Sequence, residues 1–174
     1  IDPPPTGHLK AARLLLQQLG ALDEKQQLTD LGRQVAALPT HPRLARLLVA
    51  AQREDCPSLG ADLTALLDEG LGRGKWGDPL QDLQQVGGNS APAAVNRASR
   101  FWRQRSGCGQ QPAAIDSGQV ARLLAVAWPD HIARRREGSH DQYLLANGMA
   151  AQLDVASPWR RQNFIVAIDL RARS

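Results

Sequence analysis

The spacing of the apolar residues changes once along this 174-residue chain, and this change constrains the fold more than any other sequence feature. Before about residue 137, apolar side chains recur every three or four positions, which is the spacing of one face of an α-helix. From residue 138 they alternate with polar side chains, as in half-buried strands. An aromatic content of only 4% also favours helices that pack through aliphatic side chains over a large sheet. We therefore predict a mainly α chain that finishes in a small β part.

Capping residues divide the first third of the chain into three predicted helices. Thr6 is a candidate N-cap for a first helix that stops at Gly20. Thr29 can cap a second helix, which Pro39 would end. Pro42 suits the first turn of a third helix, because a missing N–H costs no hydrogen bond there.

Helical spacing continues along the chain with one interruption. Residues 70–92 are rich in Gly and Pro around a short apolar repeat, so we expect a mobile connector there. Asp116 or Ser117 can cap the last helix, which Pro129 would follow. The further helices are expected near residues 57–67, 93–105 and 117–127.

The alternating segment predicts a β-hairpin and one more strand. Apolar residues alternate on both sides of Asn147-Gly148, a pair that is typical of a type I′ turn. A third strand is expected over residues 164–168. Three strands without a closing partner look like the start of a barrel whose open edge must be covered.

The positive charge is concentrated in one stretch of the chain. The formal net charge is only +4, yet residues 91–136 carry eight basic and two acidic side chains. All eight basic residues are arginines, whose planar guanidinium groups suit phosphate. A polyanion such as nucleic acid is one candidate partner, and a solvated arginine-rich surface without a ligand explains the composition equally well.

Two groups of arginines in this stretch are the candidate nucleic-acid contacts. The first group fans across the polar side of the helix predicted over residues 93–105. The second group is either a phosphate clamp or a helix end whose dipole favours cations. The candidates are Arg97, Arg100 and Arg103 in the first group and Arg134, Arg135 and Arg136 in the second.

Motifs for catalysis, cofactors and metals are missing from the sequence. The Gly-rich segment 70–75 follows no predicted strand and has no Ser or Thr after its Lys, so it is not a phosphate-binding loop. The four histidines are scattered, without HExxH or Cys-x-x-Cys partners, and no GxSxG motif presents a nucleophile. We predict no catalytic residue, cofactor or metal in these residues, which should turn over no substrate alone.

Features of the whole chain bear on its location and origin. No apolar run reaches the roughly 18 residues of a membrane-spanning helix, and no signal peptide opens the sequence, so we expect a cytoplasmic protein. The first residue is Ile1 and a proline-rich segment follows it, which is typical of a linker entering a domain. We therefore expect a piece of a larger protein.

The order of residues at both ends of the chain carries a resemblance. Residues 19–23, 28–33 and 41–45 read Leu-Gly-Ala-Leu-Asp, Leu-Thr-Asp-Leu-Gly-Arg and His-Pro-Arg-Leu-Ala. Residues 129–136 and 143–148 read Pro-Asp-His-Ile-Ala-Arg-Arg-Arg and Tyr-Leu-Leu-Ala-Asn-Gly. Together these segments resemble the C-terminal helicase-associated region of bacterial HrpB-type DEAH-box ATP-dependent RNA helicases. The resemblance extends over essentially the whole chain and is weak only between about residues 70 and 115.

The resemblance implies three parts and a non-catalytic role. A degenerate winged-helix module would occupy residues 1–41, a helical ratchet-like bundle residues 42–137, and the start of a truncated OB-like β domain residues 138–174. Such a segment contacts single-stranded RNA or other nucleic acid and helps couple ATP-driven motor movements to translocation and unwinding. Its implied partners are the RecA-like motor domains of the same parent chain, which would bind ATP and Mg²⁺. We expect a monomer without membrane contacts.

Two other functions remain open. A free-standing winged-helix DNA-binding regulator would explain the opening helices and would be a dimer with a recognition helix in a groove. The helix that Thr29 caps, however, carries only Arg33 as a cation. The second alternative is a protein-interaction module without nucleic-acid binding, in which the arginines only solvate a docking surface.

Overall fold

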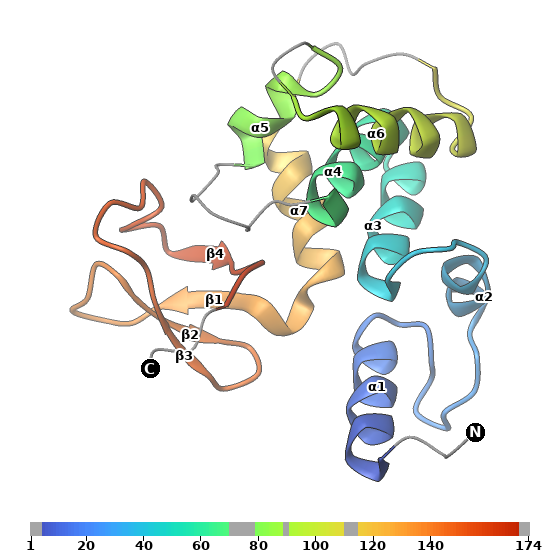
Figure 1. Cartoon of the computed structure of the whole chain (residues 1–174). Coiled ribbons are helices and arrows are strands. Elements are labelled where there is room, and N and C mark those ends of the chain that lie inside the picture. The colour runs from blue at the N-terminus through green and yellow to red at the C-terminus, as the bar shows by residue number, and fades with distance from the viewer. Residues whose placement is uncertain (1–4, 70–78, 89–90, 110–114, 171–174) are drawn as a thin grey trace.

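Four helices form a bundle at the centre of the molecule (Figure 1). The computed structural model describes residues 5–69, 79–88, 91–109 and 115–170. The middle helix, α4, is buried along most of its length, and both α3 and α6 pack against it. The four helices are α3 (Pro42–Arg53), α4 (Pro57–Glu69), α6 (Ala93–Arg105) and α7 (Ser117–Ala127).

The predicted starts of the bundle helices are confirmed. Pro42 occupies the first turn of α3, and the carboxylate of Asp116 caps α7 by accepting the Gly118 N–H at 2.8 Å. The close approach of α3 and α4 requires a glycine, because a Cβ at Gly60 would overlap the side chain of Ala51. The bundle is therefore held by tight aliphatic packing, as the low aromatic content indicates.

Two shorter helices, α1 (Thr6–Gln18) and α2 (Asp30–Ala36), precede the bundle. Thr29 caps α2 as predicted: its hydroxyl accepts the Gly32 N–H at 2.9 Å and donates to the Gly20 carbonyl at 2.7 Å. The prediction for Thr6 is wrong, because Pro5 holds the cap position of α1 without a side-chain hydrogen bond.

The segment predicted as a connector contains a helix. This helix, α5 (Pro79–Gln85), packs against α4, and both Leu83 and Val86 belong to the main core. The helical spacing of this apolar repeat thus outweighs the glycines and prolines around it. Residues 70–78 and 89–90 of the predicted connector lie outside the described residues.

Four antiparallel strands form one sheet in the order β3-β2-β1-β4, where we predicted three strands. The additional strand is β1, which a short 3₁₀ turn, η1 (Pro129–His131), separates from α7. The sequence predicts this segment as the end of the helical part, because four residues are too few to display a period. It becomes a strand because β2 and β4 pair with its two edges. The strands are β1 (Ile132–Arg135), β2 (Gln142–Leu145), β3 (Ala150–Gln152) and β4 (Phe164–Val166).

The hairpin of β2 and β3 is confirmed, but its turn differs from the predicted type. A type I′ turn needs a positive φ at both central residues, whereas only Gly148 of this loop has one, at +85°. The Gly148 N–H donates to the Leu145 carbonyl at 2.9 Å, and the Leu145 N–H donates to the Met149 carbonyl at 2.8 Å. The loop is therefore a three-residue connection that ends in a left-handed glycine.

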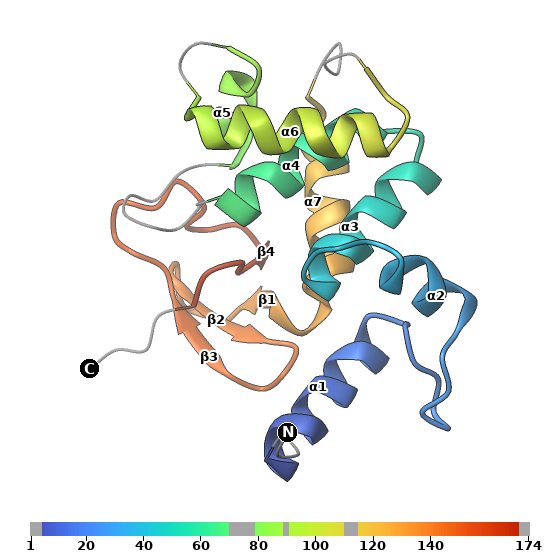
Figure 2. The ribbon, with the colours of Figure 1, turned by 45° about the vertical axis from the view of Figure 1, so that its right-hand side comes forward.

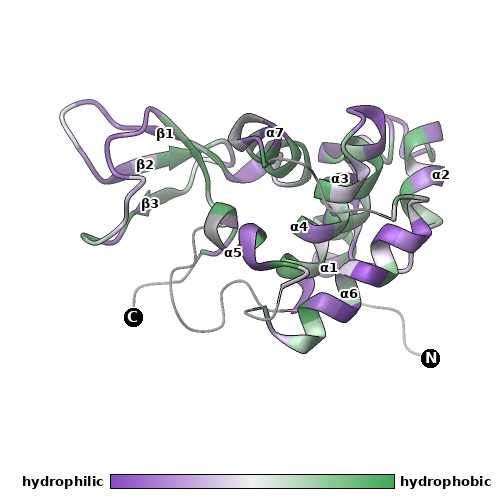
Figure 3. Ribbon diagram, turned by 90° about the horizontal axis from the view of Figure 1, so that it is seen from above, coloured by the Kyte–Doolittle hydropathy of each residue, from purple (hydrophilic) through white to green (hydrophobic). Residues whose placement is uncertain are grey.

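The sheet and the helices lie at opposite ends of the molecule when it is seen from above (Figure 3). One face of the sheet has its own small core, in which Ala133, Tyr143 and Leu145 are fully buried. Val166 and Ile168 pack instead against the core of the bundle. Among the described residues, no helix is long and apolar enough to cross a membrane.

Candidate nucleic-acid interface

Helix α6, which carries the first predicted group, crosses the outside of the bundle over α4 (Figure 2). The side chains of Arg97 and Arg100 are exposed. In the part of the chain that the structure describes, neither guanidinium has a hydrogen-bond or ion-pair partner. Both are therefore free to meet an anion.

The third member of this group, Arg103, points inward, contrary to the prediction. Its Nε and Nη2 donate to the two carboxylate oxygens of Asp62 at 2.8 and 2.5 Å, and Ser99 Oγ donates to Asp62 Oδ1 at 2.6 Å. Arg103 is 8% exposed and Asp62 only 2%. A buried ion pair requires both charges, because a single one would remain unpaired in the core. Arg103 therefore joins α6 to α4 and is not available to a phosphate.

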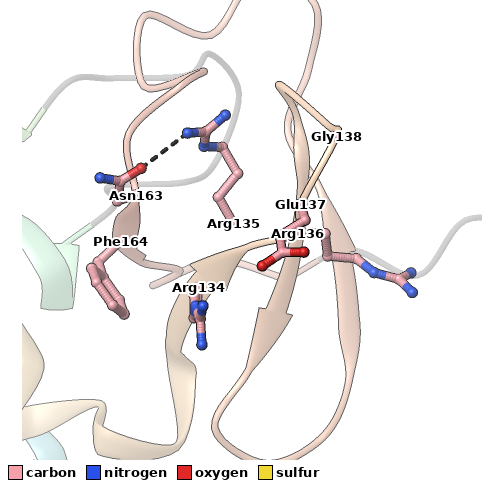
Figure 4. A pocket seen from close by; sticks show the side chains of 7 residues that line it. All are labelled: Arg134, Arg135, Arg136, Glu137, Gly138, Asn163 and Phe164. Atoms are coloured by element: carbon pink, nitrogen blue, oxygen red, sulfur yellow. Dashed lines mark hydrogen bonds between the residues drawn. The ribbon is translucent and has the colours of Figure 1, made fainter.

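The second group lies at the end of β1 and not on a helix: Arg134 and Arg135 are the last residues of the strand, and Arg136 follows it. Successive side chains of a strand point to opposite faces, so Arg134 and Arg135 point to opposite faces of the sheet. The side chain of Arg136, beyond the strand, points away from Arg134 (Figure 4). Arg135 donates to the Ser139 carbonyl at 3.0 Å and to Asn163 Oδ1 at 2.9 Å. The guanidinium groups of Arg134 and Arg136 are exposed and have no partner among the described residues. The alternative of a helix end for this group is excluded.

An open hollow of about 510 Å³ lies at this end of β1 (Figure 4). Phe164 and Asn163 come from β4 and the loop before it, and the backbone of Phe164 is paired with that of Arg134. Phe164 is 65% exposed, although it is one of only two phenylalanines in the chain. The residues that line the hollow are Arg134, Arg135, Arg136, Glu137, Gly138, Asn163 and Phe164.

The sequence did not point to Phe164 as a site residue. It was predicted as part of a strand, but the register that sets it beside Arg134 depends on pairing between segments 30 residues apart. The available signal was the alternation of β4, which assigns Phe164 and Val166 to one face.

The structure does not bring the two arginine groups together. α6 lies on the bundle and β1 in the sheet, and both Figure 1 and Figure 3 show other helices of the bundle between them. The candidate interface therefore consists of two separate surfaces, one with Arg97 and Arg100 and the other with Arg134 and Arg136.

Comparisons with known proteins agree on one family. ATP-dependent RNA helicase HrpB of Escherichia coli is 37% identical over 172 residues, which is 96% of this chain and 19% of the relative. A crystal structure of the E. coli DExH-box NTPase HrpB superposes with a TM-score of 0.77 and covers 95% of this chain and 19% of that chain. The chain is a helicase-associated region of the HrpB type.

Two further matches bear on the extent of this HrpB-type region. ATP-dependent RNA helicase HrpA of E. coli is 35% identical over 147 residues, which is 76% of this chain and 10% of the relative. Residues 12–40 match the family described as helicase associated domain (HA2), winged-helix. The chain thus spans about a fifth of HrpB and a tenth of HrpA. Both arginine groups lie outside the winged-helix match.

A further arginine of the HrpB-type region connects the bundle to the sheet. Arg43 at the start of α3 donates from Nη1 and Nη2 to the two oxygens of Asp130 at 2.7 and 2.8 Å, and from Nη1 to the Ala127 carbonyl at 2.9 Å. Its guanidinium also lies 5.8 Å from the centre of the Trp128 ring. Burial would raise the pKa of Asp130, but the hydrogen bonds and charge of Arg43, with the charge of His131, lower it below its usual value. The ion pair therefore fixes η1, and with it the start of β1, against the bundle.

A second, smaller hollow of about 360 Å³ adjoins Arg43. His41 and Asp68 lie on its border. Burial and the charge of Arg43 lower the pKa of His41, and the charge of Asp68 opposes them. In the described part of the chain, no group of three or more His, Cys, Asp or Glu side chains could hold a metal ion.

Proposed function

We propose that this helicase-associated region contacts single-stranded RNA through Arg97, Arg100, Arg134 and Arg136 within a larger ATP-dependent helicase. One observation carries the proposal: four exposed guanidinium groups, without protein partners among the described residues, lie on two surfaces of one accessory segment. Guanidinium groups neutralise phosphates without reading sequence. The relatives are named as ATP-dependent RNA helicases, and for this reason we propose RNA as the polyanion that this chain contacts.

The role that we propose is to couple ATP-driven motor movements to the RNA strand. Motor domains elsewhere in the parent chain would bind ATP and Mg²⁺ and are the second proposed partner. The winged-helix module at residues 1–41 would serve mainly as a connector to them. The helical part at residues 42–137, which ends in β1, and the β part at residues 138–174 would hold the RNA strand. The Arg43–Asp130 pair supports this arrangement, because it fixes the segment that leads into β1 against the start of α3.

The test measures the affinity of the 174-residue chain for a fluorescein-labelled oligouridylate by anisotropy between about 50 and 200 mM salt. Each lost phosphate contact lowers the slope of log K against log salt by about 0.7 on a single strand. We therefore expect Arg97→Gln/Arg100→Gln and Arg134→Gln/Arg136→Gln each to reduce the slope by about 1.4 if each removed arginine makes one contact.

The matched control is Arg13→Gln/Arg33→Gln, which removes the same charge from exposed residues of α1 and α2. It should leave the slope nearly unchanged. A slope that falls only in this control would favour the winged-helix regulator, because the contact would then lie in the first module. A folded chain without measurable affinity for the oligonucleotide would overturn the proposal and favour the protein-interaction module.

A further inference from the structure

The face of the sheet opposite its small core presents a row of exposed side chains beside Val166, which packs against the bundle. Arg134 pairs in register with Leu144 on one side and with Phe164 on the other. Residues that face each other across antiparallel strands point to the same side of the sheet. Phe164 is 65% and Leu144 50% exposed, whereas Tyr143 and Leu145, the neighbours of Leu144 on the opposite face, are buried.

Phe164 differs from the other exposed phenylalanine of the chain. The Phe101 ring packs edge-on against Trp102, with 4.9 Å between the ring centroids. Phe164 has no ring contact and belongs to none of the apolar clusters among the described residues. A large aromatic ring exposed to this degree lacks the burial that normally stabilises it, and a ligand that covers the ring would supply that burial.

The charges around Phe164 indicate which ligand fits. Arg134 and Arg136 both line the same hollow, and among the described residues Glu137 is the only acidic one that lines it. An apolar protein surface laid over Phe164 would desolvate these cations without pairing them, which is costly. A nucleotide satisfies both features, because a base has a flat π-face for the ring and its phosphate accepts from a guanidinium.

We infer that Phe164 is a base-stacking residue of this surface: an unpaired base of a single strand lies on its ring while an adjacent phosphate is bound by Arg134. The inference rests on the proposed function and adds a contact to the bases that arginines alone do not provide. Stacking tolerates any base, because every base offers a π-face. The surface therefore binds a single strand that carries unpaired bases more tightly than a polyanion without bases. It does not discriminate between base sequences.

The experiment compares two probes of equal length on the 174-residue chain, an oligouridylate and an abasic ribose-phosphate oligomer. Phe164→Leu keeps an apolar side chain but removes the π-face. It should weaken oligouridylate binding roughly five- to a hundred-fold, in keeping with alanine substitutions of stacking residues, and leave abasic binding unchanged. Phe164→Tyr keeps the ring and should restore the oligouridylate affinity. Phe101→Leu is the matched control and should change neither affinity, and circular dichroism melts verify that each variant is folded.

The possible outcomes separate this inference from the proposed function. A wild-type chain that binds neither probe overturns both. A wild-type chain whose oligouridylate affinity survives Phe164→Leu overturns the stacking role alone, and the exposed ring would then belong to a protein contact. A loss that is equal for the two probes also contradicts stacking, because an abasic strand has nothing to place on the ring.

Discussion

The two arginine groups, one on α6 and one at the end of β1, each contain three arginines and are used alike in the structure, although their spacing and secondary structure differ. In each group one arginine is bound to another side chain of the protein, Arg103 to Asp62 and Arg135 to Asn163. The other two members of each group remain exposed. The difference lies in burial: Arg103 is 8% exposed, whereas the Arg135 pair lies near the surface. The number of arginines in the sequence is therefore larger than the number that can contact a ligand. The period of each helix or strand decides which of them are exposed.

The largest expected effect is a difference in the free energy of unfolding between variants of Arg103 and of Arg100, which lies one helical turn before it. Arg103→Ala leaves the Asp62 carboxylate buried and unpaired and should lower the free energy of unfolding by about 3–5 kcal/mol. Arg100→Ala should change it by less than about 0.5 kcal/mol, because the side chain is exposed. Urea denaturation of the two variants provides the measurement. Equal stability of the two would contradict the committed role of Arg103.

A smaller effect is expected at the Arg43–Asp130 pair, which holds the β1 surface against the bundle. Asp130→Asn removes the charge that accepts two hydrogen bonds from Arg43 and should cost about 1.5–3 kcal/mol at pH 7. The pKa of Asp130 is lowered in the folded protein, so the carboxylate of Asp130 is protonated more readily in the unfolded chain than in the folded one. The stabilisation is therefore complete above pH of about 4 and is lost as the pH falls further.

Urea midpoints at neutral pH and across the acid range below about pH 4 test this expectation. Wild-type stability should fall more steeply with acid than that of Asp130→Asn, which has no carboxylate to protonate. Parallel pH profiles would show that the pair does not contribute.

The smallest effect distinguishes Arg135 from Arg134 within β1. Arg135→Gln loses hydrogen bonds to Ser139 and Asn163 and should cost about 1 kcal/mol. Arg134→Gln should be neutral within about 0.5 kcal/mol, because its side chain is exposed. Thermal melts of the two variants measure the difference. A larger loss from Arg134→Gln would mean that the two residues had exchanged roles.

Local signals in the sequence determined most of the helical part and the existence of the hairpin. Thr29, Pro42 and Asp116 mark helix starts because capping and the missing proline N–H act on adjacent residues. The change of period near residue 138 located the β part, since a period of two is visible wherever a strand has one buried face. The order of residues at both ends of the chain pointed to the HrpB type, which the comparisons confirm.

Tertiary structure alone decided which arginines form the surfaces and what accompanies them. Arg103 turns inward because Asp62, on a helix 41 residues away, needs a counter-charge in the core. β1 becomes a strand because partners bind both of its edges, and that pairing makes Arg135 the inward member of its group. Phe164 meets Arg134 only through the register of β4. Each of these outcomes depends on contacts between distant segments, which neither the periodicity nor the composition of one segment contains.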